Sequence, residues 1–212
     1  NISYVKNNVV SVKGQSIIST NRITEAGRPI NSYYLYQVTG IYQTQAQIDG
    51  SAKFSNAVKP GYLQYKDPDK SGTLDGNDRI TVGSSSPKYT YGFNFNVGYG
   101  HFQLTSFWQG VQGGSIYPSL NFAWPFNNGA GVTKQWINGS WTPTNTSAKL
   151  PILTTATGAS ENFQPSTFWL RSASYLRLKD LQLRYNLPEK LASKLTAHKM
   201  TLFIDANNIL TF

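Results

Sequence analysis

Along one stretch of the chain, large apolar and small or polar residues alternate with a period of two, which is the repeat of a β-strand. The even positions of this stretch include Asn94 and Asn96, and a tight turn is expected at residues 100–101, after which the alternation resumes. The pattern predicts a β-hairpin over residues 89–109 with one aromatic face and one polar face. The aromatic face would carry Tyr89, Tyr91, Phe93, Phe95, Val97 and Tyr99.

Weaker strand patterns occur on both sides of the hairpin. We expect strands within residues 1–13, 175–187 and 200–206, with a helical turn at residues 188–198 before the last of them. Within residues 175–187 the phase of the alternation shifts near Lys179 and Asp180, and a β-bulge would repair that shift.

The predicted connections between these strands alternate between short and long. The short ones are residues 100–101 and 188–198, and the long ones are residues 14–88 and 110–174. Outer-membrane barrels combine short periplasmic turns with long extracellular loops in this way. The assignment requires that the strand-like residues 33–42 belong to the first long loop and do not cross the membrane.

The surroundings of the hairpin bear on whether it lies in water or in lipid. From residue 89 to residue 133 there is no Asp, Glu, Lys or Arg, although the chain average predicts about six. Eleven residues rising roughly 3.3 Å each and tilted by about 45° cover about 25 Å, the height of the lipid-facing band of a barrel. Alternation alone fits both a soluble β-sandwich and a membrane barrel. The uncharged window and the loop lengths favour the barrel.

Composition excludes several classes of protein. Aromatic residues make up 14% of the chain and charged residues only 14%, which disfavours disorder. Cysteine is absent, so there is no disulfide framework and no thiol nucleophile. The net charge of +9 is scattered and accompanied by no nucleic-acid-binding motif, so we expect no nucleic-acid partner. The two histidines, His101 and His198, lie at predicted turns, and we therefore expect no catalytic centre.

Residues 67–78 carry the sharpest local motif, DPDKSGTLDGND. Oxygen-bearing residues fall at the spacing of a twelve-residue calcium loop, with Gly72 at the sharp turn and Leu74 at the apolar anchor position. The last ligand is Asp instead of the usual Glu, and no long helices flank the loop. The motif predicts a stand-alone structural calcium site, and the alternative is a solvated acidic turn. The predicted ligands are Asp67, Asp69, Ser71, Thr73, Asp75 and Asp78.

Four tryptophans, Trp124, Trp136, Trp141 and Trp169, lie in or just after the second long connection. Their rings could stack on sugars or anchor the membrane interface, and the alternative is packing within the loops.

Short motifs spread over the whole chain carry a family resemblance. They are GIYQT (40–44), GYLQYKD (61–67), NDR (77–79), PKYTYGFN (87–94), WQGV (108–111), WTP (141–143), SYLRLKD (174–180) and NNILTF (207–212). In this order and spacing they resemble the C-terminal part of a SusC/RagA-type TonB-dependent outer-membrane transporter of Bacteroidota.

The resemblance implies an all-β fold, an antiparallel transmembrane barrel of about 22 strands with a plugged lumen and long extracellular loops. Residues 1–212 would form a single region of that barrel, with the plug, the TonB-contacting region and the final strands outside it. Such a transporter imports oligosaccharides, or in some cases peptides, through the bacterial outer membrane together with a SusD-like surface lipoprotein. The alternative that we retain is a secreted all-β carbohydrate-binding module stabilised by calcium.

Overall fold

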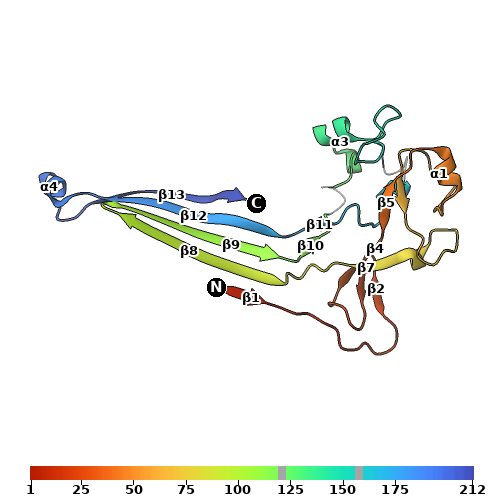
Figure 1. Ribbon diagram of the computed structural model, residues 1–212, viewed down its shortest axis with the longest axis horizontal. Coiled ribbons are helices and arrows are strands. Elements are labelled where there is room, and N and C mark those ends of the chain that lie inside the picture. The colour runs from red at the N-terminus through yellow and green to blue at the C-terminus, as the bar shows by residue number, and fades with distance from the viewer. Residues whose placement is uncertain (119–122, 156–159) are drawn as a thin grey trace. The chain divides into compact units, whose positions relative to one another are not determined.

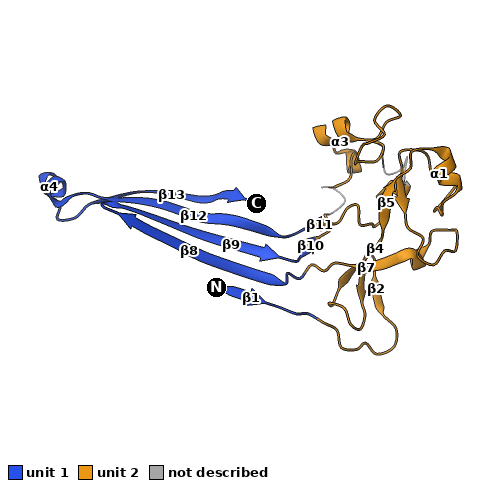
Figure 2. Cartoon of the chain, viewed as in Figure 1, with its two compact units in different colours: residues 1–7, 86–115, 172–212 blue, residues 8–85, 116–171 orange. Residues whose placement is uncertain are grey.

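The computed structural model describes residues 1–118, 123–155 and 160–212 (Figure 1). The chain divides into two compact units, shown in Figure 2. The first unit comprises residues 1–7, 86–115 and 172–212, and the second comprises residues 8–85 and 116–171. Among the described residues, no helix is both long and apolar enough to cross a membrane.

The first unit is built on a five-stranded sheet with the order β1-β8-β9-β12-β13, in which every pairing is antiparallel. Its four long strands are the two arms of the predicted hairpin and the two strands predicted near the end of the chain. The alternating sequence pattern is confirmed at each of them. The strands are β1 (Ile2–Tyr4), β8 (Tyr89–Tyr99), β9 (Phe102–Gln112), β12 (Tyr175–Asn186) and β13 (Thr201–Thr211).

The predicted bulge lies in β12. Leu178 pairs with Trp108 and Asp180 pairs with Phe107, so Lys179 is an extra residue relative to β9. An extra residue reverses the side-chain alternation once. The leucines before and after the bulge consequently share one face of the sheet.

The long connections begin and end at the same end of the sheet. Tyr89, at the start of β8, pairs with Tyr4 and with Gln112, and Tyr175, at the start of β12, pairs with Val111. The opposite end of the strands carries the short turn at residues 100–101 and the turn between β12 and β13. The latter holds α4 (Glu189–Ala192) and η4 (Ser193–Leu195).

The first predicted strand is shorter than expected, because only Ile2–Tyr4 of residues 1–13 pair with the sheet. Beyond Tyr4 one further backbone bond follows, in which Val5 N–H donates to the carbonyl of Lys88 at 2.9 Å. The polar residues 6–8 then end the pairing, and Val9 exchanges backbone hydrogen bonds with residues 27 and 28 of the second unit.

The second unit consists of the two long connections. It contains a four-stranded sheet in the order β2-β3-β4-β7 and a two-stranded sheet of β5 and β6, so residues 33–42 lie in the loop region as predicted. A further two-stranded sheet pairs β10 with β11. The remaining elements are β2 (Ile17–Ser19), β3 (Arg22–Thr24), β4 (Ser32–Tyr36), β5 (Val38–Ile41), α1 (Gln45–Asp49), β6 (Leu63–Tyr65), η1 (Gly76–Asp78), β7 (Arg79–Val82), β10 (Ser115–Ile116), η2 (Asn127–Gly129), α3 (Lys134–Gly139), η3 (Ser160–Phe163) and β11 (Arg171–Ser172).

Buried aromatic and aliphatic side chains form the core of the second unit in two clusters. One contains Tyr42, Ile48, Val58 and Tyr62, and the other contains Tyr36, Leu63, Tyr65 and Leu74. A hydrogen bond between residues far apart in the sequence joins this core to a later segment: Asn162 Oδ1 accepts from Leu63 N–H at 2.7 Å. Loops of this length are therefore held by a core of their own.

Candidate functional site

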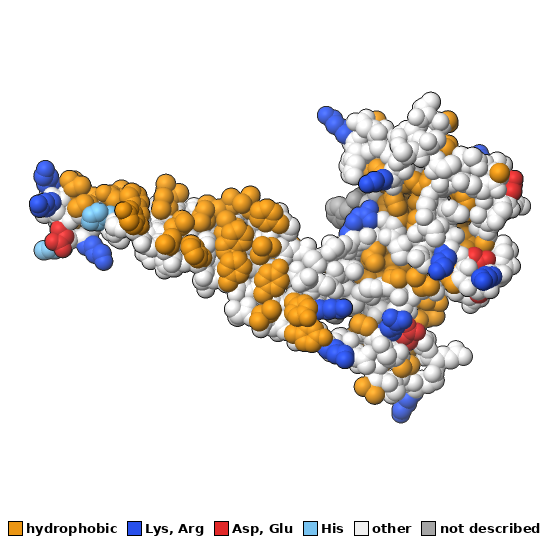
Figure 3. All heavy atoms as spheres, in the orientation of Figure 1, with side chains coloured by type: hydrophobic (Ala, Val, Ile, Leu, Met, Phe, Trp, Pro, Cys, Tyr) orange, Lys and Arg blue, Asp and Glu red, His pale blue; other side chains and the backbone are white. Residues whose placement is uncertain are grey.

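One face of the first unit's sheet is apolar and exposed. The cross-strand register places the predicted aromatic face of β8 beside Phe102 and Leu104 of β9 and in line with the leucines of β12. Phe95 is 54% exposed and Ile204 is 73% exposed. Figure 3 shows these side chains as a continuous apolar band along the strands. The exposed members of the band are Tyr89, Phe93, Phe95, Val97, Tyr99, Phe102, Leu183, Leu202, Ile204, Leu210 and Phe212.

Aromatic rings on this face pack closely against neighbouring groups. Phe93 and Trp108 are stacked with ring centroids 5.8 Å apart, and the indole N–H of Trp108 donates to Ser106 Oγ at 3.1 Å. The ring of Tyr91 covers Gly110 so closely that a Cβ there would lie 2.3 Å from the Tyr91 ring. The Trp108–Ser106 bond satisfies a polar group on this face, as contact with hydrocarbon requires.

The opposite face of the same sheet is mainly polar and charged, with Phe107 and the exposed Phe203 as apolar exceptions. Gln103 Nε2 donates to Asn96 Oδ1 across the hairpin at 3.2 Å, and Arg177 Nε donates to Thr211 Oγ1 at 2.9 Å. The register places four more polar residues on this face. They are Asp180, Gln182, Arg184 and Asp205.

Charged residues gather at the short-turn end of the band. Lys190 and Lys194 lie in α4 and η4, and Lys199 follows them before β13 (Figure 3). Basic side chains at the edge of an apolar band lie where a membrane has its polar headgroups. Together the two faces and this edge have the features of a lipid-facing barrel segment with a polar lumen.

The second unit contains the acidic loop. One carboxylate oxygen from each of Asp67, Asp69 and Asp78 lies within 4.8 Å of the other two, so the structure brings three of the six predicted calcium ligands together. Backbone N–H groups hold the first two in place: Gly72 N–H donates to Asp67 Oδ2 at 2.9 Å, and Ser71 N–H donates to Asp69 Oδ1 at 3.0 Å. The bond from Gly72 lowers the pKa of Asp67.

Asp78 is the most buried member of the loop, with no exposed surface. Its Oδ2 accepts from Asp75 N–H at 2.7 Å, whereas its Oδ1 is buried without a hydrogen-bond partner. Burial raises the pKa of Asp78, and the neighbouring carboxylates of Asp69, Asp67 and Asp75 raise it further, against the opposing effect of the Asp75 N–H bond.

The remaining predicted ligands have other contacts. Asp75 lies outside the three-carboxylate cluster, because its side chain caps η1 by accepting from Asn77 N–H at 2.7 Å. Ser71 Oγ donates to the carbonyl of Thr73 at 2.8 Å. Leu74 is buried in the core cluster of Tyr36, Leu63 and Tyr65, as its apolar anchor position predicts.

The predicted tryptophans pack against other residues of the second unit. Trp169 is buried and stacks on Phe163 at 5.8 Å and on Trp136 at 6.1 Å, and Trp124 lies 4.8 Å from Phe163. Trp141 is also buried, and its indole N–H donates to the side-chain oxygen of Gln43 at 2.7 Å. These four side chains therefore pack within the loops, which was the alternative to sugar stacking or membrane anchoring.

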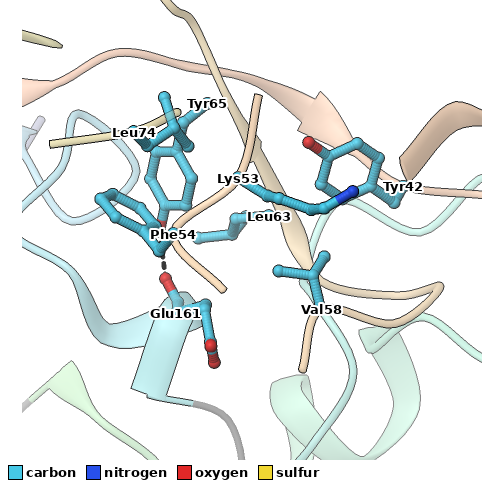
Figure 4. A pocket seen from close by; sticks show the side chains of 8 residues that line it. All are labelled: Tyr42, Lys53, Phe54, Val58, Leu63, Tyr65, Leu74 and Glu161. Atoms are coloured by element: carbon cyan, nitrogen blue, oxygen red, sulfur yellow. Dashed lines mark hydrogen bonds between the residues drawn. The ribbon is translucent and has the colours of Figure 1, made fainter. Parts of the chain in front are cut away.

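A small pocket in the second unit is bordered by polar groups that hydrogen-bond to one another. Tyr65 Oη donates to the backbone carbonyl of Glu161 at 2.6 Å, and the carboxylate of Glu161 accepts from Ser55 Oγ (2.5 Å). Burial raises the pKa of Tyr65 far above its ordinary value, so this hydroxyl is a structural donor. The lining residues, drawn in Figure 4, are Tyr42, Lys53, Phe54, Val58, Leu63, Tyr65, Leu74 and Glu161.

Two curated relatives are similar to this chain in sequence, both from Formosa agariphila. TonB-dependent receptor P3 is 31% identical over 204 residues, which is 95% of this chain and 20% of that protein. TonB-dependent receptor P26 is 25% identical over 173 residues, which is 81% of this chain and 17% of that protein. The chain thus spans about a fifth of the length of the relatives that it matches. No family model matches the sequence.

Solved structures agree with the fold. The RagAB peptide importer in its open-open state matches 92% of this chain and 20% of its own chain, with a TM-score of 0.63 at 23% identity. The RagAB peptide transporter matches with the same TM-score at 22% identity. The chain is accordingly a segment of a TonB-dependent receptor of the bacterial outer membrane, with the antiparallel β-sheet fold that it shares with the RagAB structures.

Proposed function

We propose that the full-length protein imports a nutrient across the outer membrane, driven by TonB through a region outside these residues. The observation that carries this proposal is the two-faced sheet of the first unit. Its outward positions on the four long strands are uncharged, and many of their large side chains are exposed. Soluble monomers rarely expose an apolar patch of more than a few hundred Å². Contact with lipid on one face and with a polar lumen on the other explains why one face of the sheet is apolar and the other is mainly polar.

The same face argues against the alternative of a secreted carbohydrate-binding module. Such a module would bury its apolar face in a sandwich core. Its sugar platform would also need freely exposed aromatic rings, whereas Trp141 and Trp169 are buried and the half-buried Trp124 and Trp136 pack against Phe163 and Trp169.

A surface lipoprotein of the SusD type is the partner that we propose, docking on the second unit. Long loops with a core of their own form a persistent surface, and a persistent surface is what a stable protein partner requires. The cargo class that we propose is oligosaccharide or peptide. The peptide alternative draws on the fold shared with the RagAB peptide importer, and the polar lining of the sheet is suited to either cargo.

The test uses the full-length receptor in its own bacterium. We expect it to fractionate with outer membranes and to require detergent for extraction. We also expect its deletion to abolish growth on one oligosaccharide or peptide source, with growth restored by the wild-type gene. Recovery of the receptor from the soluble fraction without detergent would refute the membrane assignment. A deletion strain that grows normally on every such source would refute the import function.

A further inference from the structure

We propose that Asp67, Asp69 and Asp78 form a calcium site in the second unit, with Ca²⁺ as a structural ion. The acidic spacing of residues 67–78 first indicated this site, but an acidic cluster alone is also what a solvated turn produces. Two observations of the structure favour a calcium site over a solvated turn. The first is the convergence of the three carboxylates, and the second is the burial of Asp78 with an unpaired Oδ1.

The convergence has the size of a calcium coordination sphere. Calcium binds oxygen at 2.3–2.6 Å, so two ligands on opposite sides of one ion lie roughly 4.6–5.2 Å apart. One carboxylate oxygen from each of the three aspartates lies within 4.8 Å of the other two. One ion could therefore contact all three without a large movement of the loop.

Asp78 supplies the second observation. This side chain is completely buried, and its Oδ1 has no hydrogen-bond partner although Oδ2 has one. A buried carboxylate oxygen without a partner is costly, because it has lost its water and gained nothing in exchange. The same side chain belongs to the converging set with Asp67 and Asp69. A cation bound there would compensate the buried oxygen and the repulsion between the three carboxylates.

The identity of the ion follows from the donors. All candidate ligands are oxygens, and three of them are carboxylates, which suits a hard divalent cation. Ser71 Oγ and the Thr73 carbonyl, already hydrogen-bonded to each other, are further oxygens in the same loop. An irregular loop of this kind can provide the six to eight ligands that Ca²⁺ accepts, whereas Mg²⁺ demands a near-ideal octahedron.

The position of the loop explains what the ion would do. Leu74 is anchored in the core, and η1 leads directly into β7, which pairs with β4 along residues 79–82. The backbone N–H of Leu74 also donates to the Lys53 carbonyl at 3.3 Å. An ion that ties Asp67 and Asp69 to Asp78 would therefore fasten the loop between β6 and β7 onto the core of the second unit.

The experiment uses the full-length receptor in detergent, stripped of metal with a chelator and then titrated with Ca²⁺ alone. Hydrogen exchange of residues 67–78 is the local readout, because a receptor of this size can bind calcium elsewhere. We expect exchange in this segment to slow at least tenfold with millimolar or lower Ca²⁺, and Mg²⁺ at the same concentration to have little effect. Unchanged exchange at 10 mM Ca²⁺, well above the weakest sites of extracellular modules, would overturn the proposal.

Matched variants make the assignment specific. Asp67→Asn and Asp69→Asn each remove one charge and keep a side-chain oxygen, and each should raise the Ca²⁺ concentration needed for half-maximal protection at least tenfold. Asp49→Asn removes the same charge from α1, outside the acidic loop, and should leave that concentration unchanged. Asp75→Asn should raise this Ca²⁺ concentration less than Asp67→Asn or Asp69→Asn does, because the Asp75 side chain caps η1. An equal effect of Asp49→Asn would mean non-specific charge screening and would overturn the site. The outcome does not depend on transport, so it is independent of the proposed import function.

Discussion

A single lysine placed on one face or the other of β8 tests the assignment of lipid and lumen. Phe95 and Asn94 are neighbours in sequence on opposite faces of the strand. Phe95→Lys would put a charge among the exposed apolar side chains of the band, and Asn94→Lys would put it on the polar face. The two variants introduce the same side chain at nearly the same depth, so once the loss of the Phe95 ring is controlled for, they compare the lysine on the two faces of the strand.

The expected magnitude follows from the position of Phe95 in the strand. β8 has 11 residues, of which Asn94 is the sixth and Phe95 the seventh. With a rise of about 3.3 Å and a tilt of about 45°, Phe95 lies roughly 2 Å from the middle of the band. Lysine on the lipid face near the midplane costs about 2–4 kcal/mol. A polar, water-facing position costs about 0.5 kcal/mol or less.

The assay is denaturant-induced unfolding of the full-length receptor in lipid vesicles, followed by tryptophan fluorescence. Phe95→Ala is measured alongside, because part of the cost of Phe95→Lys is the loss of the ring itself. We expect Phe95→Lys to be less stable than Phe95→Ala by about 2 kcal/mol or more, and Asn94→Lys to be close to wild type. Equal destabilisation by the two lysines, or a larger cost at Asn94, would refute the assignment of the faces.

Two further predictions concern the core of the second unit, with hydrogen exchange at the Leu63 amide as the readout. Gly61→Ala should destabilise this core by about 2–5 kcal/mol, because Gly61 has φ +91° and an added Cβ would lie 2.4 Å from the Trp141 ring; Gly76→Ala, with open space around it, is the control and should be near neutral. Asn162→Ala should cost about 1–3 kcal/mol, because it leaves the buried Leu63 N–H without its acceptor. Exchange at Leu63 as slow as in the wild type would contradict either prediction.

The positions of the long strands, and the face on which each of their side chains lies, can be predicted from short stretches of this sequence. Period-two alternation depends only on neighbouring residues, since successive side chains point to opposite faces. The hairpin, the two later strands and the bulge at Lys179 could therefore be predicted from the sequence. The spacing within residues 67–78 is local in the same sense, and it identified the aspartates that converge as well as the anchor Leu74.

Other features depend on contacts between residues far apart in the chain. The polar face is defined by the register of β12 against β9 and β13, which brings Arg177 to Thr211. Likewise, Trp141 meets Gln43 and Leu63 meets Asn162, each across about a hundred residues. No local pattern reports which of several long-range partners is chosen.

The sequence by itself thus determined the long strands of the first unit, their apolar face and the membrane environment, because alternation and the lack of charge can be read from neighbouring residues. Only the tertiary structure decided that the first strand pairs over Ile2–Tyr4 alone, that the tryptophans are packed, and that Asp75 caps η1 instead of joining Asp67, Asp69 and Asp78. The physical reason is that burial and pairing depend on what the rest of the chain brings to each residue.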